Sequence, residues 1–130
     1  MNQIPPIPSL LDWTDPSVRE REQPPADIVV GGRPTAEIWP AVPFDGPRDV
    51  SYGVWVGQPG SMRSDAYPYD EVFVVLEGSV RLESADGTSI EVQPGQTCFL
   101  PQGWQGIWHT VTPTRKTYFV AAQPEQGSIQ

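Results

Sequence analysis

Short runs rich in strand-forming residues follow one another along the chain from residue 27 onward, with glycine, proline and other turn residues between them. Examples are DVSYGVWVG, EVFVVLEG, SVRLES and RKTYFVAA; apolar and polar residues alternate most clearly in SVRLES, whereas EVFVVLEG is apolar throughout its centre. A period of two is typical of strands with one buried face, and no long segment has the period of a helix. Closely spaced short strands of this kind predict an all-β fold, an antiparallel sandwich or barrel.

Two turns and one strand face can be assigned from this pattern. Residues 85–88 (ADGT) separate two strand runs, and Asp-Gly is a strong signal for a tight hairpin. Residues 93–95 (QPG) predict a second turn. In the run that begins at Glu71, side chains two positions apart share a face. We therefore expect Glu71, Phe73 and Val75 to point to the same face of this strand.

Residues 1–26 differ from the rest of the chain because they are rich in proline and lack apolar periodicity. Asp15 and Pro16 suit the N-cap and first position of a short helical turn through SVRERE. The apolar residues of the segment are Ile4, Ile7, Leu10, Leu11 and Trp13. They favour an extended arm that lies on a surface, its own or a neighbour's, over a disordered tail. We expect an arm at 1–26, a barrel at 27–122 and a tail at 123–130.

Length, composition and charge limit the classes of protein that fit. A chain of 130 residues suits a single domain, and 16 prolines with 12 glycines in no regular period fit frequent turns. A formal net charge of −8 repels phosphate backbones, so we expect no nucleic-acid partner. With no apolar run of about 18 residues and no basic-then-apolar N-terminus, we expect neither a membrane span nor a signal peptide.

The chain has one cysteine, Cys98, inside the apolar run TCFLP. A single cysteine allows no intrachain disulfide, which suits a reducing compartment. We expect a buried structural thiol and a cytoplasmic location.

Two glycine-bounded segments resemble the sequence signatures of the cupin family, which has a small antiparallel jelly-roll barrel. The end of the first signature is present as Glu71, six residues and Gly78. The start of the second is present as Gly95, five residues, Pro101, one residue and Gly103. The number of residues between the two segments also agrees with the spacing of the two signatures in cupins. The resemblance implies a cupin jelly-roll barrel with an extended N-terminal arm.

Three of the four metal ligands of an ordinary cupin are replaced. The two histidine positions of the first signature hold Asp65 and Tyr67, and the third histidine position holds Gly106. Only Glu71 stands where the resemblance implies a ligand. Zinc and iron sites generally need imidazole or thiolate ligands, so we expect no metal and no cofactor. An unusual site that uses Glu71, Asp65 and His109 is the alternative.

Further segments resemble one cupin subgroup, the one that includes ureidoglycine aminohydrolase and the ethanolamine-utilisation cupin. These segments are PQGWQGIW, RKTY at 115–118, Gly-Val-Trp at 53–55 and Gln-Pro-Gly at 58–60. The resemblance covers about residues 27–122. It predicts the fold well and the reaction poorly, because one fold carries many functions.

The resemblance implies that positions 106 and 110 face the inside of the barrel, as does the ligand position held by Glu71. With strand alternation, this implies that Trp108, Phe73 and Val75 point inward and that His109 points outward. The candidate catalytic residues are Glu71 and Tyr67, and the candidate ligand-binding residues are Arg63, Asp65, Trp55, Trp104, Trp108 and Tyr118. Each has a purely structural interpretation. Glu71 would form a buried ion pair with Arg63, the tryptophans would fill the volume of the lost metal site, and Tyr67 with Tyr69 would pack at the rim. Arg115 and Lys116 would be edge-strand charges.

The residues favour a small-molecule-binding cupin with a degenerate metal site, acting in a metabolic or biosynthetic pathway. An alternative is a metal-independent isomerase, cyclase or lyase such as a dehydratase, with Glu71 as general base and Tyr67 as proton donor. A metal-dependent hydrolase of the ureidoglycine aminohydrolase type and a purely structural subunit are further alternatives. The resemblance and the apolar arm together imply a homodimer.

Overall fold

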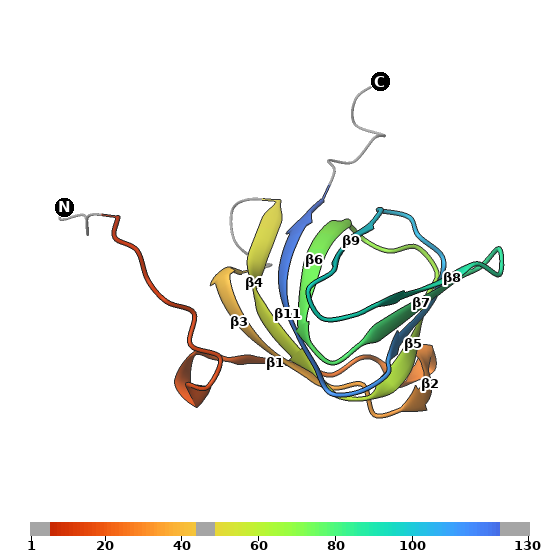
Figure 1. The fold of residues 1–130 in the computed structure, drawn as a ribbon, viewed down its shortest axis with the longest axis horizontal. Coiled ribbons are helices and arrows are strands. Elements are labelled where there is room, and N and C mark those ends of the chain that lie inside the picture. Colours follow the sequence, from red (N-terminus) through yellow and green to blue (C-terminus); the bar gives the residue numbers. More distant parts are fainter. Residues whose placement is uncertain (1–5, 44–48, 123–130) are drawn as a thin grey trace, which may run out of the picture.

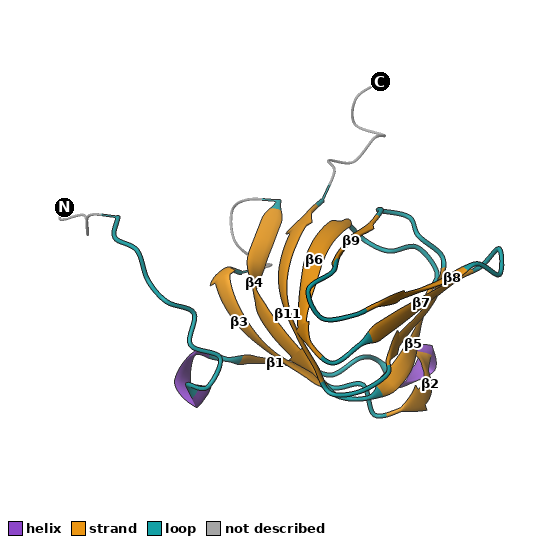
Figure 2. Cartoon of the chain, in the orientation of Figure 1, coloured by secondary structure: helices purple, strands orange, loops and turns teal. Residues whose placement is uncertain are grey.

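The computed structural model describes residues 6–43 and 49–122, which form two antiparallel β-sheets that curve around a common interior (Figures 1 and 2). Sheet A contains, in spatial order, β1 (Glu20–Glu22), β3 (Ala36–Val42), β4 (Val50–Gly57), β11 (Thr114–Ala121), β6 (Asp70–Glu77) and β9 (Thr97–Leu100). Sheet B contains β2 (Val29–Gly32), β5 (Gly60–Ser64), β10 (Gly106–Thr110), β7 (Val80–Ser84) and β8 (Ser89–Val92).

Helix makes a small contribution to this part of the chain. The described residues contain two single-turn 3-10 helices, η1 (Pro16–Val18) and η2 (Ala26–Ile28). No helix in the described segments is long and apolar enough to cross a membrane. The prediction of an all-β antiparallel jelly roll is confirmed.

Neighbouring strands are often distant in sequence. In sheet A the last strand, β11, lies between β4 and β6, and in sheet B β10 lies between β5 and β7. Only Gln58 and Pro59 separate β4 from β5, yet these two strands belong to different sheets. Crossovers of this kind are typical of jelly rolls. As a result, side chains from β4, β6 and β11 project together into the interior.

Alternate residues of the facing strands form the core. Phe73 and Val75 on β6 are completely buried. Val72, whose side chain points to the outer face of the same strand, is 42% exposed. Trp108 on β10 belongs to the same buried cluster from the opposite sheet. Glu71 is buried with them, so the predicted inward face of β6 is confirmed.

The predicted hairpin is present between β7 and β8. One carboxylate oxygen of Asp86 accepts hydrogen bonds from the backbone N–H of Thr88 at 2.9 Å and from its hydroxyl at 2.7 Å. Gly87 has a φ of 93°, in the left-handed region where glycine carries no Cβ penalty. Local bonding and one glycine therefore determine this turn.

The second half of the N-terminal arm packs on sheet A. Asp15 caps η1 as predicted, since its carboxylate accepts a hydrogen bond from the backbone N–H of Ser17 at 3.0 Å. The helical turn ends at Val18 and does not continue through SVRERE, because Glu20–Glu22 pairs with β3 as strand β1. The indole N–H of Trp39 on β3 donates to the backbone carbonyl of Asp15 at 2.8 Å, which ties the arm to the sheet.

The chain before η1 extends away from the two sheets (Figure 1). Ile7 is 75% exposed and Leu10 is 95% exposed, so these apolar side chains have little cover from the described part of their own chain. The extended stretch ends before residues 12–15, where the Asp15 N–H donates to the Asp12 carbonyl at 3.0 Å in a turn and the Trp13 ring lies 4.8 Å from the Arg115 guanidinium of sheet A. Ile4 and the predicted tail at 123–130 lie outside the described residues.

Candidate functional site

A cavity of about 520 Å³ opens between the two sheets. Its lining includes all the residues that the sequence singled out, namely Glu71, Tyr67, Arg63, Asp65, Trp55, Trp104, Trp108 and Tyr118. They come from β4, β5, β6, β10 and β11 and from the loops beside them. The volume lies within the range of sites for small organic molecules.

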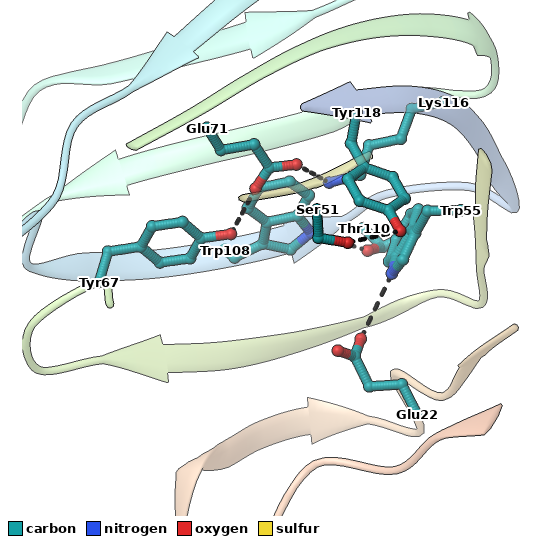
Figure 3. Close-up of polar contacts among 9 residues, drawn as sticks. All are labelled: Glu22, Ser51, Trp55, Tyr67, Glu71, Trp108, Thr110, Lys116 and Tyr118. Atoms are coloured by element: carbon teal, nitrogen blue, oxygen red, sulfur yellow. Dashed lines mark hydrogen bonds and ion pairs between the residues drawn. The ribbon is translucent and has the colours of Figure 1, made fainter. Parts of the chain in front are cut away.

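A buried carboxylate with two hydrogen-bond donors lies in this cavity. Glu71 on β6 is 3% exposed. Its Oε2 accepts a hydrogen bond from Nζ of Lys116 at 2.7 Å, and its Oε1 accepts one from the hydroxyl of Tyr67 at 2.5 Å (Figure 3). The two donors come from β11 and from the loop before β6. Each carboxylate oxygen of Glu71 is therefore bound by a hydrogen-bond donor, and one of the two donors is a cation.

The ammonium group of Lys116 is surrounded by aromatic rings. Its nitrogen lies 4.6 Å from the ring centroid of Trp55, 4.5 Å from that of Phe73 and 4.2 Å from that of Trp108. Ring faces at these distances attract a cation electrostatically. With the Glu71 carboxylate at 2.7 Å, the Lys116 ammonium has both a counter-ion and three aromatic rings around it inside the protein.

Two structural interpretations from the sequence are wrong at this point. The partner of Glu71 is Lys116 and not Arg63. Lys116 is not an edge-strand charge, because β11 lies between β4 and β6 and the residue is 4% exposed. The sequence did carry a signal for it: Tyr118 was expected to face the cavity, and a period of two places Lys116 on the same face.

Arg63 and Asp65 lie at the mouth of the cavity. Nε of Arg63 lies 2.9 Å from Oδ1 of Asp65, and the two side chains are 42% and 74% exposed. Arg63 also donates to the backbone carbonyl of Asp27 at 3.1 Å. The two charges therefore compensate each other at the rim, and neither pairs with Glu71.

Aromatic side chains form the outer wall of the cavity. Tyr67 makes edge-to-face contacts with Tyr69 and Trp104 at centroid distances of 5.2 and 6.3 Å. The indole N–H of Trp104 donates to the hydroxyl of Ser84 at 2.9 Å, which fixes the ring. Burial, together with the charge of Glu71, raises the pKa of Tyr67 well above 10.0. The Tyr67 hydroxyl therefore keeps its proton and donates a hydrogen bond to Glu71.

The N-terminal arm supplies a carboxylate that the sequence did not identify. Glu22 on β1 lines the cavity, and its Oε1 accepts a hydrogen bond from the indole N–H of Trp55 at 3.3 Å (Figure 3). Its neighbours Pro24 and Pro25, in the segment that links sheet A to β2 of sheet B, also line the cavity. No local pattern in the sequence indicates that the arm reaches this position.

Trp55 fits the interior because of a glycine two residues away. A Cβ atom on Gly57 would lie 2.0 Å from Cη2 of the Trp55 indole, so the ring occupies the space that a side chain at residue 57 would need. At the other side of the cavity, the indole N–H of Trp108 donates to the hydroxyl of Thr110 at 3.0 Å. The inward orientation predicted for Trp108 is confirmed, with 5% exposure.

His109 lies on the outer face of sheet B, as predicted. Its Nδ1 is 2.7 Å from the hydroxyl oxygen of Ser61 and its Nε2 is 3.0 Å from Oε1 of Glu83. The imidazole therefore does not join Glu71 and Asp65. Across the described residues, no three histidine, cysteine, aspartate or glutamate side chains are grouped so that they could hold a metal ion.

Gly106, at the third histidine position of the cupin pattern, is closely packed. A Cβ atom here would lie 2.2 Å from the carbonyl oxygen of Glu83 and 2.6 Å from Cζ2 of Trp104. Any side chain at this position would therefore displace backbone or the Trp104 ring. Because the Lys116 ammonium also occupies one side of Glu71, the residues present do not fit a transition-metal ion.

The facing antiparallel sheets, with a carboxylate of the first glycine-bounded segment inside them, define a protein of the cupin class. The chain belongs to the EutQ-like cupin domain family, whose model matches residues 46–118. The predicted membership of the cupin superfamily is therefore confirmed. Among curated protein sequences there is no match.

Solved structures share the fold. A protein of unknown function of the DUF861 family from Pseudomonas syringae pv. tomato is 27% identical, with a TM-score of 0.68, and the match covers 77% of this chain and 42% of that one. The chain thus spans less than half of that relative. A putative ethanolamine utilization protein, EutQ, from Salmonella typhimurium is 20% identical, with a TM-score of 0.57 and coverage of 68% and 71%.

A third similar structure is the ectoine synthase from P. lautus, 15% identical with a TM-score of 0.56, with 72% of this chain and 67% of that chain covered. At these low identities, the likeness to EutQ and to ectoine synthase concerns the fold alone.

Proposed function

We propose that the cavity between the sheets binds a small organic molecule. We also propose that the Lys116 ammonium supplies at Glu71 the positive charge that a metal ion supplies in cupins with histidine ligands. The observation that carries the proposal is the buried Glu71–Lys116 pair, 2.7 Å apart, in a cavity of about 520 Å³. A metabolic role in the cytoplasm is part of the proposal and is supported by the buried, unpaired thiol of Cys98.

A purely structural role for this cavity is less well supported. Two charges buried as an ion pair stabilise a fold no more than apolar residues of similar volume, and often less. A chain that needed only a filled interior would gain by replacing Glu71 and Lys116 with apolar residues. Buried polar groups that face an open cavity are instead typical of ligand sites.

A metal-independent isomerase, cyclase or lyase is the second candidate. It is favoured by the 2.5 Å contact between the Tyr67 hydroxyl and Glu71, which places a proton donor beside a carboxylate. Each oxygen of Glu71 already accepts one hydrogen bond, however, and the carboxylate is 3% exposed, so a substrate proton could reach Glu71 only at the lone pairs that remain. Binding requires no proton transfer to this buried group. A metal-dependent hydrolase fits least well, given Lys116 and Gly106.

The binding function can be tested by screening a library of small metabolites against the purified protein by thermal shift, followed by calorimetric titration of the hits. We expect hits whose affinity falls when Trp104 at the cavity is changed to alanine. Phe99→Ala is the matched control, because Phe99 is 59% exposed and does not line the cavity. Equal losses in both variants, or no hit at all, would count against the proposal.

The metal part of the proposal has its own test. Elemental analysis of protein purified without added metal should give far less than one zinc, iron, nickel or manganese ion per chain. A stoichiometric metal that is retained in Lys116→Met would contradict the role assigned to the ammonium group.

We further propose that the chain forms a homodimer. The proposal is supported by the exposed apolar side chains of the arm, of which Ile7 and Leu10 are 75% and 95% exposed. Burial of such residues against a second copy would remove apolar surface from water.

A further inference from the structure

We infer that the ligand of this cavity is an organic monocation, an amine or ammonium group carried on an apolar or planar body. The inference rests on the proposed binding function and concerns the chemical class of the ligand. It depends on which charges facing the cavity are compensated, on the potential at the aromatic wall and on the ring faces that remain near the mouth.

Four of the five charged side chains that line the cavity compensate one another in pairs. Lys116 is bound to Glu71 at 2.7 Å, and Arg63 is bound to Asp65 at 2.9 Å. The fifth is Glu22, which is exposed at the rim and makes no ion pair within residues 6–43 and 49–122. Its one described contact is the neutral indole N–H of Trp55. The uncompensated charge facing the cavity is therefore a carboxylate.

The tyrosine hydroxyls of the cavity experience this negative potential. Burial is the main cause that raises the pKa of Tyr67, Tyr69 and Tyr118, and the charges of Glu71 and Glu22 raise all three further. A negative potential favours a bound cation and disfavours a bound anion.

The rings near the mouth are suited to a cation. Trp55, Phe73 and Trp108 surround the Lys116 ammonium, and Tyr67, Tyr69 and Trp104 form the outer wall. An ammonium ligand could lie against this outer wall with Glu22 at the rim, in the way that aromatic side chains and carboxylates recognise quaternary ammonium groups. An anionic ligand would find Lys116 and Arg63 already bound to carboxylates.

Three probes of nearly equal size and shape separate the ligand classes: benzylamine, benzyl alcohol and benzoate. Their binding can be followed by titration of the isotope-labelled full chain with protein-observed nuclear magnetic resonance. We expect benzylamine to bind most tightly and benzoate least tightly. Cation–ring attraction alone predicts a preference for the amine over the alcohol of roughly threefold or more. Added salt should weaken the binding of benzylamine and leave the binding of benzyl alcohol unchanged.

Glu22→Gln is the decisive variant, because it removes the uncompensated charge and keeps the shape of the side chain. We expect this variant to weaken the binding of benzylamine about fivefold, which is the effect of one solvent-screened charge at close range. The binding of benzyl alcohol should not change. Glu91→Gln is the matched control, since Glu91 on β8 is exposed and does not line the cavity.

The outcomes distinguish the inference from the proposed function. If the probes bind in the cavity with no preference for the amine, or if Glu22→Gln behaves like Glu91→Gln, the ligand is not a cation and the inference is overturned while the binding function stands. If none of the three probes binds at tens of millimolar, the inference is overturned, and the metabolite screen with its Trp104→Ala and Phe99→Ala variants decides separately whether the binding function stands.

Discussion

The ammonium nitrogen of Lys116 lies 2.7 Å from Oε2 of Glu71, and the two side chains are 5% and 3% exposed. They come from adjacent strands of sheet A, β11 and β6, and both point into the interior (Figure 3). Neither charge has enough contact with water to be stable alone. Each therefore depends on the other, and the pair gives a direct test of how the site is held together.

Lys116→Met should lower the free energy of unfolding by about 3–5 kcal/mol, because it leaves the Glu71 carboxylate buried without its cation. Urea denaturation measures this change. The matched control is Arg81→Met, which removes a cation from the exposed pair with Glu83, 3.7 Å apart, and should cost about 1 kcal/mol or less. Similar losses in the two variants would show that the buried pair is unimportant for stability.

Glu71→Gln should also destabilise the fold, since it leaves the Lys116 ammonium without a carboxylate. The double variant Lys116→Met with Glu71→Gln leaves no charge unpaired. Its loss in the free energy of unfolding should therefore be clearly smaller than the sum of the losses in the two single variants. A double-mutant cycle measures the coupling, which we expect to exceed about 1 kcal/mol. Additive losses would mean that the two side chains do not interact.

Tyr67 should make the fold sensitive to alkaline pH. Its pKa is raised above 10.0 in the folded chain, mainly by burial, so the folded state keeps the proton at a pH where the unfolded chain loses it. Its contribution to stability is fully present below pH 10 and is lost as pH rises from there through the folded pKa. Urea denaturation at several pH values measures this effect. Above pH 10, the free energy of unfolding should decline less steeply in Tyr67→Phe than in the unchanged protein.

The control for this profile is Tyr52→Phe. Tyr52 lies on the outer face of sheet A, where its ring stacks on Phe119 at 5.3 Å, and does not line the cavity. Its replacement shows the effect of losing a tyrosine hydroxyl outside the cavity. If both variants change the profile equally, the burial of Tyr67 is not its cause.

Gly106→Ala should destabilise the protein by about 1–3 kcal/mol or more, because the added methyl group meets the carbonyl oxygen of Glu83 and the Trp104 ring. Gly31→Ala is the control, since a Cβ there has ordinary contacts of 3.8 Å with Ser61. Melting temperatures of the two variants give the comparison. A Gly106→Ala variant as stable as Gly31→Ala would show that a side chain fits this position.

Deleting residues 1–11 should weaken the proposed dimer and leave the fold intact. It removes the exposed Ile7 and Leu10 but keeps the Asp15 carbonyl that binds Trp39 and the strand β1. Analytical ultracentrifugation measures the association, and thermal melting checks the fold. A full-length chain that is monomeric at high concentration would contradict the dimer. Deletion through residue 24 is a poorer test, because it also removes β1.

The fold and part of the site could be predicted because they depend on local patterns. The cupin-like position of Glu71, extended by period-two alternation, indicated the inward face of β6, and Asp86 with Gly87 indicated the hairpin. Lys116 was accessible to the same argument, but its charge and its neighbour Arg115 suggested a solvent-exposed edge. Glu22 could not be predicted, because its position depends on the pairing of β1 with β3, and register between strands distant in sequence is set by the whole fold.

The contact between Trp55 and Gly57 couples two positions in the sequence. The indole of Trp55 fills the space above Gly57, so a chain with even an alanine at position 57 has to carry a smaller residue at position 55. That exchange would remove one ring from around the Lys116 ammonium. Among related sequences, residues 55, 57 and 116 are therefore expected to vary as one set, and a lysine at position 116 should accompany glycine at position 57.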